Sequence, residues 1–178
     1  MKPGIFAVLV LLICSLAAAS PKPDPIDMAA KALSQKDYGA VIDARISDLD
    51  GDGVRELVAI TCKSRENGHP MGGVVAVMRQ EKAGWKVVHK ISGLNPWKLR
   101  TTDVDGDKKQ EISLGVWKKS PKDPVMAKRV FLYDWSDNLM KPKWLGSRLS
   151  RRFKDFEFKD INRDGWDELL ALEISPGK

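Results

Sequence analysis

The stretch that decides the fold is Asp48-Leu49-Asp50-Gly51-Asp52-Gly53-Val54-Arg55-Glu56-Leu57. The same arrangement of acidic residues returns twice, as Asp103-Val104-Asp105-Gly106-Asp107-Lys108-Lys109-Gln110-Glu111-Ile112 and as Asp160-Ile161-Asn162-Arg163-Asp164-Gly165-Trp166-Asp167-Glu168-Leu169. The three copies start 55 and 57 residues apart. A repeat at a spacing of this size indicates that the chain is built from copies of one supersecondary unit.

The residues around each acidic stretch indicate β-strands. Before the first stretch, apolar Ile42, Ala44 and Ile46 alternate with polar residues, which is typical of a half-buried strand. After it, the apolar run 57–60 is typical of a strand buried on both faces. In the first two repeats a further pair of strands follows, joined by a turn. We therefore predict an all-β protein of four-stranded antiparallel meanders, with ten strands in about two and a half repeats.

The start of the chain has the pattern of a secretory signal peptide. Lys2 precedes the apolar run 5–16, and small residues lead up to Ser20, so we expect cleavage after Ala19 and a periplasmic or secreted protein. The apolar run is too short for a transmembrane helix, so we expect no span in the mature chain. We assign 1–19 to the signal peptide, 20–40 to a segment with one short helix packed on the first repeat, and 41–178 to the repeats (about 41–94, 95–149 and 150–178).

The composition excludes several classes of protein. With 43% hydrophobic and 30% charged residues, the chain is neither a multi-span membrane protein nor a disordered one. Two His and two Cys, in no zinc-binding spacing, leave no basis for a zinc site or a catalytic triad, and His69 is expected to be solvated in a loop. The basic residues of 148–154 carry part of the net charge of +6. Secretion argues against a nucleic-acid partner, so we interpret them as a solvated face; attraction to anionic envelope polymers or lipid headgroups is the alternative.

The acidic stretches have the spacing of metal-binding loops. Positions 1, 3 and 5 carry side-chain oxygens and position 9 a carboxylate, and such crowding is costly unless a cation neutralises it. Calcium takes six to eight oxygens, which the side chains, the backbone carbonyl of position 7 and water can supply. We expect up to three Ca²⁺ sites, with these ligands: Asp48, Asp50, Asp52, Val54 and Glu56; Asp103, Asp105, Asp107, Lys109 and Glu111; Asp160, Asn162, Asp164, Trp166 and Glu168.

The second loop departs from the other two. Lys108 stands where the first and third loops have Gly, and a non-Gly residue at positive φ costs about 1 kcal/mol. Its ammonium also repels a cation, so we expect this site to be the weakest, or empty. An EF-hand is excluded because it needs Glu at position 12, where Ala59, Leu114 and Ala171 stand. Metal-free Asp-Gly turns are the alternative interpretation, and three copies in register favour calcium.

Asp-x-Asp-Gly-Asp-Gly followed by Glu-Leu, recurring between strands, resembles the FG-GAP and VCBS repeat families, and the VCBS type more closely. The resemblance covers about Val41 to the C-terminus. It implies calcium-binding β-propeller blades whose loops stabilise the first two strands of each blade, and it supplies no catalytic residue. Two and a half blades do not close a ring, so an open sheet edge is expected to be available for self-association.

These observations lead to two hypotheses of function. The first is a secreted or periplasmic calcium-binding repeat protein that is not an enzyme and binds an envelope protein or a glycan. The alternative is an accessory or catalytic subunit of a polysaccharide-active enzyme. That alternative requires acids outside the loops to face one cleft, and the candidates are Asp123, Asp134, Asp137, Asp155 and Glu157.

Overall fold

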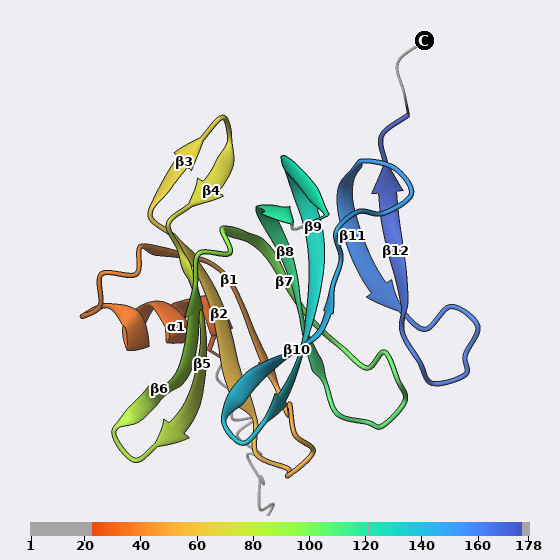
Figure 1. Ribbon diagram of the computed structural model, residues 1–178. Helices are drawn as coiled ribbons and strands as arrows, with labels where there is room; N and C mark the ends of the chain where they lie inside the picture. The colour runs from red at the N-terminus through yellow and green to blue at the C-terminus, as the bar shows by residue number, and fades with distance from the viewer. Residues whose placement is uncertain (1–22, 121, 176–178) are drawn as a thin grey trace, which may run out of the picture.

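The computed structural model describes residues 23–120 and 122–175, and this part of the chain is all-β with one short helix (Figure 1). The predicted signal peptide lies outside the described residues. In the described part, no helix has the length and apolar character needed to cross a membrane. The elements are α1 (Pro25–Leu33), β1 (Ala40–Ser47), β2 (Glu56–Cys62), β3 (Ser64–Glu66), β4 (His69–Met71), β5 (Val74–Glu81), β6 (Gly84–Ser92), β7 (Pro96–Thr102), β8 (Glu111–Ser120), β9 (Asp123–Ser136), β10 (Leu139–Leu145), β11 (Phe153–Lys159) and β12 (Glu168–Glu173).

Ten of the twelve strands form three sheets that follow the repeats, and all neighbours within them are antiparallel. Sheet I has the order β1-β2-β5-β6, sheet II has β7-β8-β9-β10, and sheet III has β11-β12. The predicted ten strands are therefore present. Each of the first two repeats folds as one four-stranded antiparallel meander, in which the strands pair in the order in which they follow along the chain, apart from the small hairpin between β2 and β5.

A small hairpin, β3–β4, is an addition that the sequence reasoning missed. Its turn is Asn67-Gly68, with φ of 49° and 81°, and this dipeptide is the preferred turn of two-residue hairpins. The hairpin places the His69 ring on Trp117 of β8, with ring centroids 3.5 Å apart and nearly parallel planes. The expectation that His69 is simply solvated is therefore wrong.

The sheets stack face to face, and their buried side chains alternate along each strand. Leu57, Ala59 and Met78 of sheet I face α1, whereas Val58 and Val77 face sheet II. This double burial explains the continuous apolar run after the first acidic stretch. A third cluster, with Phe153 and Phe156, joins sheet III to sheet II. Asp24 caps the N-terminus of α1: its Oδ1 accepts a hydrogen bond from the Ile26 N–H at 2.8 Å, and Pro25 is the first helical residue.

The first strands of the three sheets contact one another, β1 with β7 and β7 with β11. An ion-pair ladder connects them. The Arg100 guanidinium of β7 lies 3.5 Å from Asp43 of β1 and 2.5 Å from Glu157 of β11. Lys98, which is 8% exposed, lies 2.7 Å from Asp155. Charges that lie at equivalent positions of successive repeats thus hold the three sheets together.

Candidate metal centres

The three acidic loops lie side by side at one end of the molecule, the lower end in Figure 1. Each connects the first strand of a sheet to the second: residues 48–56 follow β1, residues 103–111 follow β7, and residues 160–168 follow β11. We call them the first, second and third acidic loops. The repeat of the sequence has therefore become a row of equivalent loops in space.

The loops share one backbone hydrogen-bond pattern, set by the Asp at position 1. Its two carboxylate oxygens accept from the N–H groups of positions 4 and 6, at 2.5 to 2.9 Å. Both donor positions have left-handed φ, in the first loop at two glycines and in the others at one glycine and one larger residue. The larger residues are Lys108, with φ 67°, and Arg163, with φ 66°. The predicted strain at Lys108 is present, but the third loop carries the same strain at Arg163.

The Glu at position 9 closes each loop from the start of the second strand. One of its oxygens accepts from the N–H of position 2, at 3.2 Å for Leu49 and 2.9 Å for Val104 and Ile161. Glu56 is fully buried and Glu111 is 3% exposed. Burial raises the pKa of both carboxyls, against the lowering effect of their hydrogen bonds. A buried carboxylate with a raised pKa favours any cation that reaches it.

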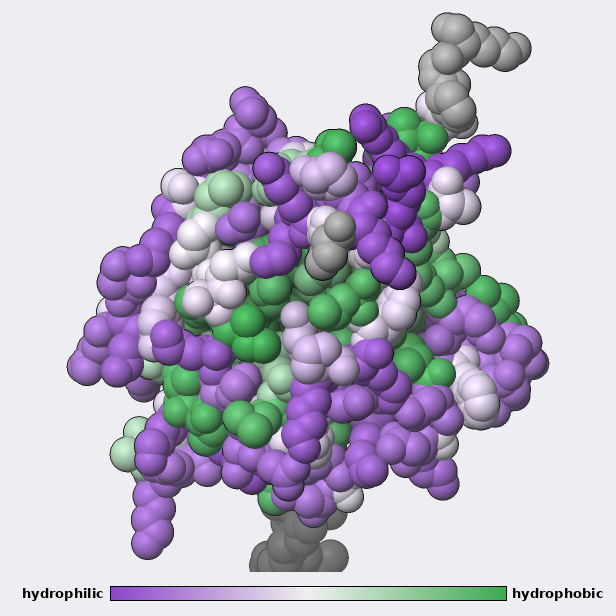
Figure 2. Space-filling model, in the orientation of Figure 1, coloured by the Kyte–Doolittle hydropathy of each residue, from purple (hydrophilic) through white to green (hydrophobic). Residues whose placement is uncertain are grey.

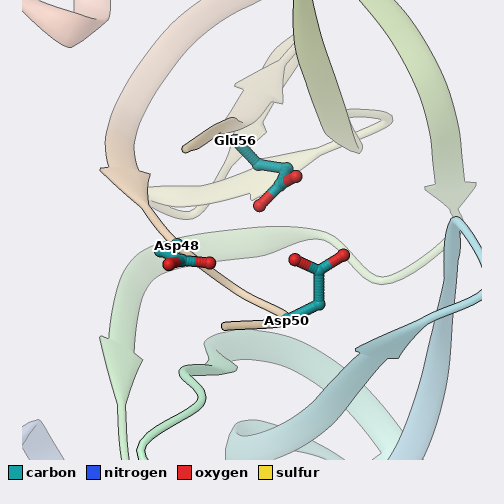
Figure 3. A group of neighbouring side chains, drawn as sticks. All are labelled: Asp48, Asp50 and Glu56. Atoms are coloured by element: carbon teal, nitrogen blue, oxygen red, sulfur yellow. The ribbon is translucent and has the colours of Figure 1, made fainter. Parts of the chain in front are cut away.

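Positions 1, 3 and 9 converge in the first two loops. In each, one oxygen of every member lies within 4.8 Å of the others, forming the triads Asp48-Asp50-Glu56 and Asp103-Asp105-Glu111. Figure 3 shows the carboxylates of Asp50 and Glu56 turned toward each other. The second oxygen of Asp50, Oδ1, is buried and accepts no hydrogen bond from the described residues. The third loop has Asn162 at position 3, so its equivalent group holds two carboxylates and one amide.

Positions 5 and 7 lie outside these triads. Their shared feature is a hydrogen bond in which the N–H of position 7 donates to the side chain of position 5: Val54 to Asp52 at 2.7 Å, Lys109 to Asp107 at 2.9 Å, and Trp166 to Asp164 at 2.9 Å. This turn orders the oxygens of position 5 at the mouth of each loop. All fifteen predicted ligand residues therefore lie in three equivalent loops. In the first and second loops, however, the side chains that converge are the three of a triad, whereas five ligands per loop were predicted.

A basic side chain, missed by the sequence reasoning, enters the first loop from β5. Arg79 Nε lies 2.8 Å from Glu56, and its terminal nitrogen lies 2.7 Å from Asp50 and 3.8 Å from Asp52. Its hydrogen bond with Glu56 is the main cause of the raised pKa of Arg79. A protein-borne positive charge thus contacts positions 3 and 9.

The second loop has the same contact from a different strand. Lys143 of β10 lies 2.6 Å from Asp105, 2.7 Å from Glu111 and 3.0 Å from Asp134. Burial lowers the pKa of Lys143, but hydrogen bonds to these three carboxylates outweigh it and raise the pKa overall. Asp134 occupies the strand position that Arg79 occupies in sheet I, since Met78 pairs with Leu57 as Tyr133 pairs with Ile112. Sheet II thus has Asp134 where sheet I has Arg79, and Lys143 of the neighbouring strand supplies the positive charge instead.

In the part of the chain that the structure describes, the third loop has no such cation. Among residues 23–120 and 122–175, no Lys, Arg or His nitrogen lies within 4.0 Å of a carboxylate of Asp160, Asp164 or Glu168. The loop is nevertheless fixed in place. The Asp167 N–H donates to the Asp103 carbonyl at 2.8 Å, and the indole of Trp166 lies so close to Gly106 that a side chain there would collide with it. The third loop therefore rests on the second.

The donor set favours a hard divalent cation. All predicted ligands are oxygens, which Ca²⁺, Mg²⁺ and Mn²⁺ prefer over softer ligands. The unpartnered oxygen of Asp50 and the buried glutamates fit a cation between the loop and the second strand. In the first two loops such a cation has to displace, or share oxygens with, Arg79 or Lys143.

Comparison with known proteins does not assign the chain to a family. No model of a known protein family matches the chain, and no curated protein matches it significantly.

Proposed function

We propose that the chain is a secreted or periplasmic calcium-binding repeat protein with β-propeller-like blades, which is not an enzyme and serves as a module that binds a protein or a glycan. The observation that carries the proposal is the recurrence of one loop conformation, with its oxygens in the same order, at the same place in three sheets. The second and third loops adopt this conformation although it places Lys108 and Arg163 at positive φ. Such strain is typical of functional sites, which supports a role for the arranged oxygens in binding a cation.

The three loops differ in the affinity we expect for calcium. The third offers its carboxylates without a competing cation in the described part of the chain, so it is proposed to bind most tightly. The first has to replace Arg79, and the second faces Lys143, Lys108 and the Lys109 ammonium, which lies 3.1 Å from Asp107. We therefore propose that the second loop has the lowest affinity for calcium. The competing ammonium groups contribute to this in addition to the strained backbone at Lys108.

The propeller-like arrangement is supported by the central position of the first strands. Because β7 contacts both β1 and β11, the first strands of the three sheets lie next to one another in the order of the repeats, as the first strands of propeller blades do. In the described chain β12 pairs with β11 alone and exposes Leu170 and Leu172, by 40% and 62%. We propose that self-association, where it occurs, uses this open edge.

The acids outside the loops support the non-catalytic interpretation. Four of them serve ion pairs: Asp134 with Lys143, Asp137 with Lys141, Asp155 with Lys98, and Glu157 with Arg100 and Lys98. The fifth, Asp123, contacts Arg129 and Arg148 at another end of the molecule. Because a basic side chain holds each of the five carboxylates, we propose that they stabilise the fold and do not act in glycoside cleavage.

Calorimetric titration of the mature protein with Ca²⁺, together with thermal unfolding in Ca²⁺ and in EDTA, tests the proposal. We expect bound calcium and a higher melting temperature in its presence. A protein that binds no calcium and melts at the same temperature in both buffers would refute it.

A further inference from the structure

A groove lined with basic residues lies at the end of the molecule opposite the acidic loops. Two adjoining cavities of about 380 and 300 Å³ share Val125, Ala127, Lys128, Arg152 and Phe153 in their walls. They lie between the far end of the β8–β9 hairpin and the connection from β10 to β11, at the top of Figure 1. We call this concavity the basic groove.

The walls of the basic groove combine apolar surface with an aromatic stack. Val125 is 53% exposed, and the buried Phe153, at the start of β11, lines both cavities with it. Trp117 and His69, which stack on each other, form the wall on the side of sheet I. On the face seen in Figure 2, hydrophilic side chains gather around the end of the β8–β9 hairpin, with apolar surface next to them. Such a mixture of apolar and polar surface is typical of a binding site.

The charge of the groove is strongly positive. Its basic lining residues are Lys128, Arg129, Arg148, Arg151, Arg152 and Lys154. Its acidic lining residue, Asp123, is already paired with Arg129 and Arg148 at 3.3 and 3.2 Å. Within the described part of the chain, Arg152 and Lys154 have no acidic group within 4.0 Å. These two cations remain available to an anionic ligand.

We propose that the basic groove binds an acidic polysaccharide, a sugar chain that carries carboxylate or sulfate groups along its length. The cations are spread over two joined cavities, which suits a polymer with repeated anions better than one small ion. Guanidinium groups bind carboxylate and sulfate in two-point geometry, and the apolar walls suit the faces of sugar rings. The groups line a concavity, which the flat surface of a lipid bilayer does not enter. This inference rests on the proposed function as a binding module, and it names the ligand.

The test is calorimetric titration of the mature protein, in calcium-containing buffer, with chondroitin sulfate, with neutral dextran and with phosphatidylglycerol vesicles. We expect chondroitin sulfate to bind and the other two not to bind. Arg152→Gln/Lys154→Gln should raise its Kd about tenfold, since two exposed charge contacts are lost. The control Lys36→Gln/Lys82→Gln removes two exposed charges elsewhere and should leave the Kd within twofold of the wild type.

A second measurement needs no variant. The chain contains two histidines, and His69 lines the groove whereas His89 lies on β6. In NMR spectra of the wild type, chondroitin sulfate should shift the ring signals of His69 and leave those of His89 in place. Equal shifts of both, equal losses in both double variants, or binding of the vesicles in place of the sugar would each overturn the proposal.

Thermal unfolding of the same samples in Ca²⁺ and in EDTA separates the two proposals. Stabilisation by calcium without sugar binding would remove the groove proposal alone. Sugar binding at the groove without any effect of calcium would remove the calcium part of the proposed function and leave the groove in place.

Discussion

The first and third acidic loops have the same backbone and different electrostatics. Both use an Asp at position 1 to hold two left-handed residues, and both close with a Glu hydrogen-bonded to position 2. In the first, Glu56 is buried and Arg79 reaches it from β5. In the third, Glu168 is only partly buried, and no basic group of the described chain contacts the acids of the loop. In a loop with the ligand spacing of a metal site, a basic side chain of the protein is therefore also able to neutralise the carboxylates.

The difference follows from the sheets behind the loops. Sheet I and sheet II have four strands; the third strand of sheet I supplies Arg79 and the fourth strand of sheet II supplies Lys143. Sheet III has two strands in the described chain, so it has no third or fourth strand there to supply such a residue. The comparison predicts that internal cations stabilise the first two loops and that calcium mainly stabilises the third.

The largest effect is expected for Arg79→Met. Without the guanidinium, the buried Glu56 loses its charged partner, and breaking a buried ion pair costs about 3 kcal/mol. Urea unfolding in EDTA measures this loss. In Ca²⁺ the loss should be smaller, because the metal can then neutralise Asp50 and Glu56.

Arg55→Met is the matched control for this experiment. Arg55 is exposed in the same loop and has no ion-pair partner among the described residues, so its loss should cost little. An equally large loss for Arg79→Met in EDTA and in Ca²⁺ would show that metal does not replace the guanidinium.

Glu168→Gln should remove most of the calcium stabilisation. Calcium at 100 times its Kd for the third loop should stabilise the wild type by about 2.7 kcal/mol, and the neutral amide should lose most of that. Thermal unfolding across a calcium series measures the effect, with Glu66→Gln on the exposed β3–β4 hairpin as the control. Unchanged calcium stabilisation in Glu168→Gln would place the tightest site elsewhere.

Lys108→Gly and Arg163→Gly should each stabilise the protein by about 1 kcal/mol in EDTA, because each relieves a left-handed non-Gly residue. Gly53→Ala, at φ 84°, should destabilise it by a similar amount. Thermal unfolding measures all three. A gain for Lys108→Gly alone would mean that the second and third loops are not strained alike.

The smallest effect concerns the attachment of sheet III. The hydrogen bond from Arg100 is the main cause that lowers the pKa of Glu157, so this ion pair stabilises the fold above the ordinary pKa of Glu, 4.5. The stabilisation is lost as the pH falls through the lower folded-state pKa. Because Glu157 is about half exposed, we expect Glu157→Gln to cost about 0.5 kcal/mol at pH 7.

Urea unfolding of Glu157→Gln and the wild type at a series of pH values tests this. The difference between them should vanish once both carry a neutral side chain at position 157. Glu81→Gln, whose pair with Lys86 lies within sheet I, is the control for loss of a surface pair. A difference that stays constant down to pH 2 would indicate a packing effect instead.

The amino-acid sequence alone determined the loops and the meanders. The acidic spacing, the alternation before each loop and the apolar run after it are local patterns, and strands and turns follow from such patterns. The short helix followed from the apolar spacing of residues 26–33 in the same way, and α1 is confirmed at Pro25–Leu33.

Only the tertiary structure decided which charges meet. Arg79 is 23 residues from Glu56 and Lys143 is 32 from Glu111, and their contacts depend on which strands are neighbours and in which register. Likewise, His69 and Trp117 meet because sheets I and II stack and the β3–β4 hairpin extends beyond them. Local periodicity is set by backbone geometry, whereas pairing between distant side chains is set by how the sheets pack, and no stretch of sequence contains that information by itself.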